Sequence, residues 1–172
     1  PAMIGWLEHE EAQTNAAHAL LAMAANNPQT QAMIAKAEGG VDGLVAVIKT
    51  GKLEAQEHAT LVIWHLASTP ENQQVVADAD GVPALVSMLA QVADANQSSR
   101  AAELAAVAIV RLVQGNAKVS MSVAEVGGII PLVKLLGARA GTAQQAAAAL
   151  AELGLLATNR DAIANSGGLE PL

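Results

Sequence analysis

The chain alternates between long segments that carry an apolar stripe at helical spacing and shorter segments that Pro or Asn opens and Gly closes. The stretch from Gln56 to Leu89 contains one full cycle. It has a long helical pattern, a break at Thr69-Pro70, a short helical pattern, a stop at Gly81 and a further helical pattern. Every other part of the sequence repeats some part of this stretch. The pattern therefore predicts an all-helical repeat array.

The long segments have the most regular pattern. Their second and third stripe positions are mostly small residues, which let neighbouring helices approach closely, and the fourth is Leu or Ile, which fills the core. The four stripes are Asn15, Ala16, Ala19, Leu20 and Met23; His58, Ala59, Val62, Ile63 and Leu66; Leu104, Ala105, Ala108, Ile109 and Leu112; and Gln145, Ala146, Ala149, Leu150 and Leu153. One repeat cannot bury such a stripe alone, so stacking on neighbouring repeats is expected to stabilise it.

The glycine-initiated segments recur at Gly40, Gly81, Gly128 and Gly168, with spacings of 41, 47 and 40 residues. Periods of about 40 to 47 residues with helical content are typical of α-solenoids. We therefore expect one array over 1–172, with a partial repeat 1–26, repeats 27–68, 69–114 and 115–157, and a partial repeat 158–172. The longest spacing predicts an enlarged loop at 90–100. Because both ends cut through a repeat, we expect further repeats in a longer chain.

Composition narrows the possible partners. Hydrophobic residues make up 52% of the chain but aromatic residues only 1%, so the core must consist of Leu, Val, Ile, Met and Ala. Charged residues make up 15%, against about 25% in an average soluble domain, which favours burial against neighbouring surfaces. The net charge of −7 argues against nucleic acid as a partner. No apolar run approaches the roughly 20 residues that span a bilayer. The absence of cysteine fits a reducing compartment, the cytoplasm or alternatively the nucleus.

No constellation of residues predicts catalysis. No Ser-His-Asp or Cys-His set can be assembled, and no phosphate-binding glycine motif follows a strand. His58 and His65 share a helix without a third metal ligand, so we interpret them as ordinary, partly buried imidazoles. The segment 78–81 resembles part of a calcium loop but lacks the distant Glu. We therefore predict a non-enzyme with no catalytic, metal or cofactor-binding residues and no cofactor.

Three segments, GVPALVSML, LASTPENQQVV and VGGIIPLVKLL, match the armadillo signature of a double glycine, a proline-initiated helix and a long helix that ends in Leu-Ala. The chain resembles the armadillo-repeat family over essentially all of its length. This resemblance implies a right-handed α-solenoid of stacked three-helix repeats whose third helices line a concave groove. It also implies a protein interaction scaffold or adaptor that binds a partner segment along that groove. The alternatives are a structural subunit of a large assembly and an accessory domain, as in armadillo-containing ubiquitin ligases.

In many armadillo proteins a Trp and an Asn, one turn apart on each third helix, hold an extended peptide. Alignment places the Trp position at His18, Leu61, Val107 and Ala148, and the Asn position at Ala22, His65, Arg111 and Glu152. Neither ladder is present, so that peptide-binding chemistry is not expected here. Trp64 lies out of register, and we interpret it as packing between helices.

One turn before the Trp position stand Thr14, Glu57, Glu103 and Gln144. The partner-binding residues predicted for the groove are Glu57, Leu61, His65, Glu103, Val107, Arg111, Gln144, Ala148 and Glu152, whereas Leu104, Ile109 and Leu150 are predicted to be buried. Three acids against one base make the groove mildly acidic. A mildly acidic groove favours a neutral or basic partner segment, extended or helical.

Overall fold

The computed structural model describes residues 10–94 and 100–167, and these residues form eleven α-helices and no strand. The helices are α2 (Glu10–Ala24), α3 (Pro28–Lys36), α4 (Gly40–Thr50), α5 (Leu53–Leu66), α6 (Pro70–Asp78), α7 (Gly81–Asp94), α8 (Arg100–Val113), α9 (Ala117–Glu125), α10 (Ile129–Leu135), α11 (Ala140–Leu153) and α12 (Ala157–Asn165). The all-helical prediction is confirmed. The first nine residues of the predicted partial repeat 1–26 lie outside the described residues.

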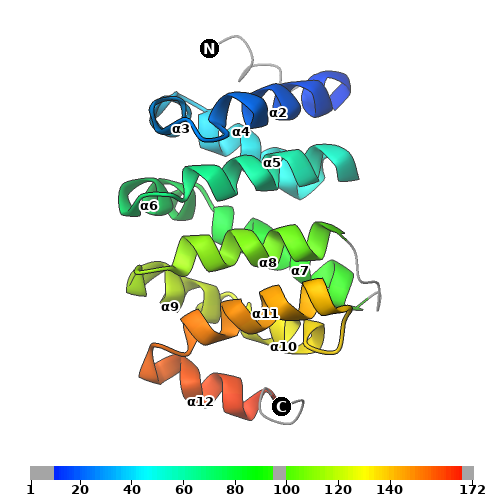
Figure 1. Cartoon of the computed structure of the whole chain (residues 1–172), viewed down its shortest axis with the longest axis vertical. Coiled ribbons are helices and arrows are strands. Elements are labelled where there is room, and N and C mark those ends of the chain that lie inside the picture. The colour runs from blue at the N-terminus through cyan, green and yellow to red at the C-terminus, as the bar shows by residue number, and fades with distance from the viewer. Residues whose placement is uncertain (1–9, 95–99, 168–172) are drawn as a thin grey trace.

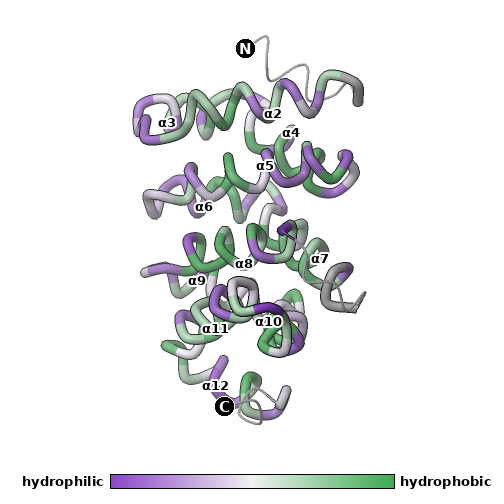
Figure 2. Tube along the Cα trace, turned by 45° about the vertical axis from the view of Figure 1, so that its right-hand side comes forward, coloured by the Kyte–Doolittle hydropathy of each residue, from purple (hydrophilic) through white to green (hydrophobic). Residues whose placement is uncertain are grey.

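Three kinds of helix alternate along the chain and form three columns (Figure 1). The third helices α2, α5, α8 and α11 lie one above another, and each packs on the next. The second helices α4, α7 and α10 lie behind them, and the short first helices α3, α6, α9 and α12 flank the column on one side. Each layer combines apolar and polar stretches along its trace (Figure 2). This stacking produces an elongated core with a similar cross-section in every repeat.

Alanine dominates the contacts between the third helices. The buried alanines on these helices, all at most 1% exposed, are Ala16, Ala17, Ala24, Ala55, Ala59, Ala101, Ala102, Ala105, Ala106, Ala108, Ala146 and Ala149. The distance between packed helices depends on the side chains at the contact, so methyl groups allow a close approach. Larger side chains such as Ile63, Ile109 and Leu153 are fully buried and belong to the same hydrophobic cluster.

The short first helices are capped and tied to their neighbours by polar side chains. Asn27, Thr69 and Asn116 each accept a hydrogen bond from the backbone N–H three residues ahead, at 3.1, 3.3 and 3.1 Å. The Gln73 amide donates to the Arg111 carbonyl of its own repeat at 3.0 Å, and across the repeat boundary to the Ala67 carbonyl. Carbonyls at the end of a helix have no partner within it, so such buried amides satisfy them.

Gln31 and Asn159 repeat this role in the flanking repeats. Gln31 donates to the Ala24 carbonyl at 2.8 Å, and Asn159 donates to the Leu153 carbonyl at 3.0 Å and to Ser120 in the preceding repeat. All four side chains, Gln31, Gln73, Ser120 and Asn159, are buried. A column of hydrogen bonds therefore runs beside the apolar core and fixes how the repeats stack.

The double glycines have two separate causes. Gly39 and Gly127 have positive φ values of 67° and 80°, a conformation that side chains with a Cβ adopt rarely. The following glycine approaches the preceding short helix closely: a Cβ on Gly128 would lie 2.8 Å from the Val123 carbonyl oxygen. In the second repeat Asp80 takes the positive-φ position, at 61°. The predicted left-handed stop is therefore present in all three repeats, with and without glycine.

Two local predictions require correction. Residues 90–94, assigned to an enlarged loop, continue α7 as helix, and α8 already begins at Arg100. The apolar stripe of α7 extends to Leu89, and the following Ala and Gln favour helix, so the insertion lengthens the second helix.

Leu104 is only partly buried, whereas Ile109 and Leu150 are buried as predicted. Met23 is 44% exposed, while its counterparts on α5, α8 and α11 are fully buried.

Ile109→Ala should lower the free energy of unfolding by roughly 2–5 kcal/mol, because the side chain is completely buried and its loss leaves a cavity between helices. The matched control is Ile130→Ala, which removes the same atoms from a side chain that is 56% exposed. Urea denaturation followed by circular dichroism measures both. Equal losses for the two variants would contradict the proposed position of the core.

Candidate functional site

The predicted partner-binding residues lie on three consecutive third helices, α5, α8 and α11, as three rows. The central row, Leu61, Val107 and Ala148, is partly buried in every repeat. The row one turn earlier contains Glu57 and Glu103, both partly buried, and Gln144, which is exposed. The row one turn later contains His65, Arg111 and Glu152, all partly buried. We call this surface the third-helix face.

Glu57 is held by the next repeat. One of its carboxylate oxygens lies 3.6 Å from the Nε of Arg100, the first residue of α8. The Glu57 side chain is 20% exposed and that of Arg100 is 72% exposed. An ion pair so open to solvent contributes at most about 1 kcal/mol, but it does neutralise the charge of Glu57. The acidic character predicted for this end of the groove is therefore reduced.

Glu103 also contacts the following repeat. A Cβ built on Gly141 would lie 3.3 Å from Oε2 of Glu103, so the carboxylate rests against the first turn of α11. The N-terminal end of a helix carries a partial positive charge, which favours a carboxylate there. The absence of a side chain at Gly141 is what allows this approach. Glu57 and Glu103 thus occupy equivalent places, each at the start of the next third helix.

Three side chains meet where the last turns of α5 and α8 lie side by side. The guanidinium carbon of Arg111 lies 5.9 Å from the centroid of the Trp64 ring, within range of a cation–π interaction. The rings of Trp64 and His65 meet edge to face at 4.6 Å. Burial, and then the positive charge of Arg111, lowers the pKa of His65. We call these residues the Arg111 cluster.

Two further histidines stack across the α2–α5 contact. The rings of His18 and His58 lie 4.9 Å apart with an angle of 18° between their planes. Nδ1 of His58 is buried and has no hydrogen-bond partner. In the described part of the chain, no group of three or more His, Cys, Asp or Glu side chains is arranged to hold a metal ion. The stacked pair therefore acts as packing between two third helices.

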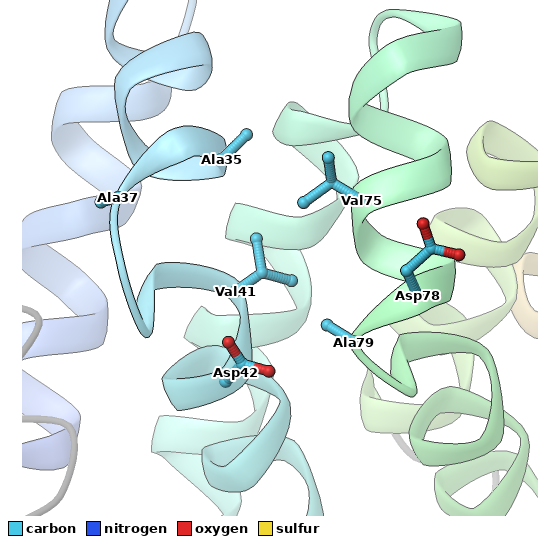
Figure 3. Close-up of a pocket in the computed structure, with 7 residues that line it drawn as sticks. All are labelled: Ala35, Ala37, Val41, Asp42, Val75, Asp78 and Ala79. Carbon is cyan, nitrogen blue, oxygen red and sulfur yellow. The ribbon is translucent and has the colours of Figure 1, made fainter.

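A shallow hollow of about 310 Å³ lies on another side of the stack, between α3 and α4 of one repeat and α6 of the next (Figure 3). Alanine and valine side chains form most of its wall, and Asp42 and Asp78 stand on the two helices that flank it. The Asp78 carboxylate already accepts a hydrogen bond from Gln74 at 2.6 Å. Among the described residues that line the hollow, the only charged ones are these two aspartates, so it offers little chemistry for a specific ligand.

Sequence reasoning located the rows but missed the contacts between them. Trp64 packs against the core as predicted, yet it also supports Arg111. Arg100 was not singled out, although it pairs with Glu57. Both contacts join residues more than 40 positions apart, and only the stacking register brings them together. No helix in the described ranges is long and apolar enough to cross a membrane.

Comparison with solved structures decides the fold. An engineered protein superposes with a TM-score of 0.87 and 28% identity, over 99% of this chain and 68% of that one. A designed armadillo repeat protein in complex with the peptide (KR)4 superposes with a TM-score of 0.87 and 24% identity, over 99% of this chain and 71% of that one. The chain is an armadillo-repeat solenoid.

Computationally designed armadillo repeat proteins for modular peptide recognition match this solenoid equally well, with a TM-score of 0.87, 24% identity and coverage of 99% and 71%. Among curated proteins, U-box domain-containing protein 12 of Oryza sativa subsp. japonica is 40% identical over 63 residues. That match covers 37% of this chain and 10% of the rice protein. No family model matches the chain. The predicted right-handed armadillo solenoid is thereby confirmed from structure.

His65 should make the stability of the solenoid dependent on pH. Its pKa in the folded state lies below the unfolded value of about 6.5, so the unfolded chain binds the proton more readily. The contribution of His65 to the free energy of unfolding is fully present above about pH 6.5. It is lost as the pH drops through the interval between the unfolded and the folded pKa. The melting temperature of His65→Gln should therefore fall less than that of the parent between about pH 7.5 and about pH 5. Identical pH profiles in thermal melts followed by circular dichroism would contradict this.

Proposed function

We propose that the solenoid is a protein-binding scaffold whose third-helix face holds a segment of a partner protein. The observation that carries this proposal is the central row of Leu61, Val107 and Ala148, which runs across three repeats and remains partly exposed in each. Apolar side chains at regular spacing, flanked by charged rows, suit an extended segment that contacts each repeat in turn. The role is binding and not catalysis, in a reducing compartment such as the cytoplasm.

Designed armadillo proteins with the same fold support a peptide segment as the ligand. One of them was solved with the peptide (KR)4, and others were made for modular peptide recognition. The present solenoid differs in chemistry, because its Asn positions hold His65, Arg111 and Glu152. None of these three positions carries the side-chain amide that would pair with a peptide backbone. Binding would therefore depend on apolar contact and on charge.

The alternative of a structural subunit rests on a different observation. Several large apolar side chains are exposed on the first helices, on the second helices and in their connections: Met33, Met121, Val126, Ile130 and Leu155. They lie on α3, α9 and α10 and ahead of α12, away from the central row. Packing against other chains would cover them. This alternative takes precedence if the third-helix face proves not to bind a segment.

The double variant Glu57→Ala, Glu103→Ala tests the charge of the face with the (KR)4 peptide as a probe. It should weaken binding, and more strongly at low salt, because exposed charges act mainly through screened long-range attraction. Removal of Glu57 also frees the positive Arg100, which adds repulsion toward a basic peptide. Fluorescence anisotropy at about 20 mM and about 150 mM salt measures the effect. Thermal stability should remain nearly unchanged.

The matched control is Glu71→Ala, Glu125→Ala, which removes the same charge from exposed positions on α6 and α9. Binding of (KR)4 to this control should change little. Equal weakening in both double variants would mean that the peptide senses only net charge. The third-helix face would then not be the site, and the structural-subunit alternative would replace it.

A further inference from the structure

Arg111 is a fixed cation on the third-helix face. Its guanidinium lies 5.9 Å from the ring centre of Trp64 on the neighbouring third helix, and Trp64 is itself packed against the core. The His65 ring meets the other side of this arrangement, edge to face with Trp64. A guanidinium over an aromatic ring keeps its N–H groups free at the edges, because the stacking uses only the faces. The side chain is therefore held without using its donors.

No acid of the face neutralises Arg111. Two ion pairs occur in the described ranges, Lys49–Asp80 and Arg100–Glu57, and neither includes it. Of the other acids on the neighbouring helices, Glu103 rests against Gly141, and Glu152, one repeat further on, forms no ion pair with it within the described residues. The lowered pKa of His65 is consistent with an unpaired charge on Arg111. Burial is the larger cause of this lowering, and the positive charge of Arg111 is the second. Arg111 therefore has no carboxylate partner among the described residues.

We infer that Arg111, Trp64 and His65 form an oxyanion subsite that receives a carboxylate side chain of the bound segment. The inference deepens the proposed function and rests on it for the source of the carboxylate. The planar guanidinium can donate two parallel hydrogen bonds to one carboxylate, and the neutral imidazole of His65 has one N–H that can add a third. The acids Glu57, Glu103 and Glu152 remain for basic residues of the segment. The partner is therefore a segment of mixed charge, with an acidic residue at the α5–α8 junction.

The first experiment examines the subsite without a peptide, with sulfate as the probe. The imidazole resonances of His65 are followed by NMR during a sulfate titration, against chloride at equal ionic strength. Sulfate should move these resonances saturably and raise the pKa of His65, because a bound anion offsets the charge of Arg111. Arg111→Gln should abolish the response, and Arg111→Lys should retain only part of it, because lysine keeps the charge but not the planar fork.

The control for the sulfate titration is Arg139→Gln, which removes an exposed arginine at the start of α11. It should leave the response of His65 intact. The subsite is overturned if sulfate leaves His65 unmoved in the parent, or if Arg139→Gln reduces the response as much as Arg111→Gln does. Circular dichroism of each variant establishes that the fold is retained.

The second experiment adds the segment. Each residue of the (KR)4 peptide is replaced in turn by Glu or by Gln, and the two series are compared. At one position Glu should bind about two- to fivefold more tightly than Gln, the range of an exposed ion pair, and Arg111→Gln should remove that preference. Sulfate binding without any peptide binding would leave the subsite standing and reject the proposed function. Peptide binding with no preference for Glu at any position would reject the carboxylate subsite and leave the proposed function standing.

Discussion

The close packing of the third helices through alanine is the constraint on which the rest of the structure depends. Side chains such as Ala59, Ala105 and Ala146 have no exposed surface, and methyl groups at a helix contact allow a close approach. An interface this close cannot accept larger residues without strain of about 1–3 kcal/mol. The uniform spacing that results places equivalent residues of successive repeats next to each other. Rows on the surface, and the contacts between rows, follow from it.

A second set of interactions fixes the angle at which the repeats stack. Gln73 joins the end of its own third helix to the end of the preceding one, and Asn159 links α12 to Ser120 and to Leu153. A buried amide without partners costs about 1–3 kcal/mol, so these hydrogen bonds hold only in one arrangement of the repeats. Apolar packing of Ala, Leu and Val tolerates small rotations, whereas a hydrogen bond does not. The polar column therefore supplies the specificity that the aliphatic core lacks.

The stacking also determines which charges remain for a partner. Glu57 and Glu103 both rest against the start of the following third helix, one on Arg100 and one on the backbone at Gly141. Arg111, at the opposite end of its helix, is supported by Trp64 and has no acid beside it in the described ranges. A count of acids and bases in the sequence therefore misjudges the face. Its acids are partly engaged within the solenoid, whereas Arg111 forms no ion pair with a described residue.

The sequence by itself determined the helices, their order and the residues that face the core. Ile109 and Leu150 were correctly expected to be buried, because the 3.6-residue period and the glycine and proline stops act within one segment. The same local signals predicted three-helix cycles of about 40 residues and the resemblance to the armadillo signature. The nine predicted groove residues indeed fall on α5, α8 and α11, since a helical register can be followed from residue to residue.

Only the tertiary structure decided which side chains meet across repeats. Arg100 with Glu57, Arg111 over Trp64 and Glu103 against Gly141 each join residues about 40 positions apart or more. Their meeting depends on how far each helix slides along its neighbour, which no local pattern specifies. The extension of α7 to Asp94 was likewise hidden, because polar and small residues are compatible with both loop and helix. The physical reason is the same in each case: local periodicity fixes the face of a helix, and packing against its neighbours fixes its position.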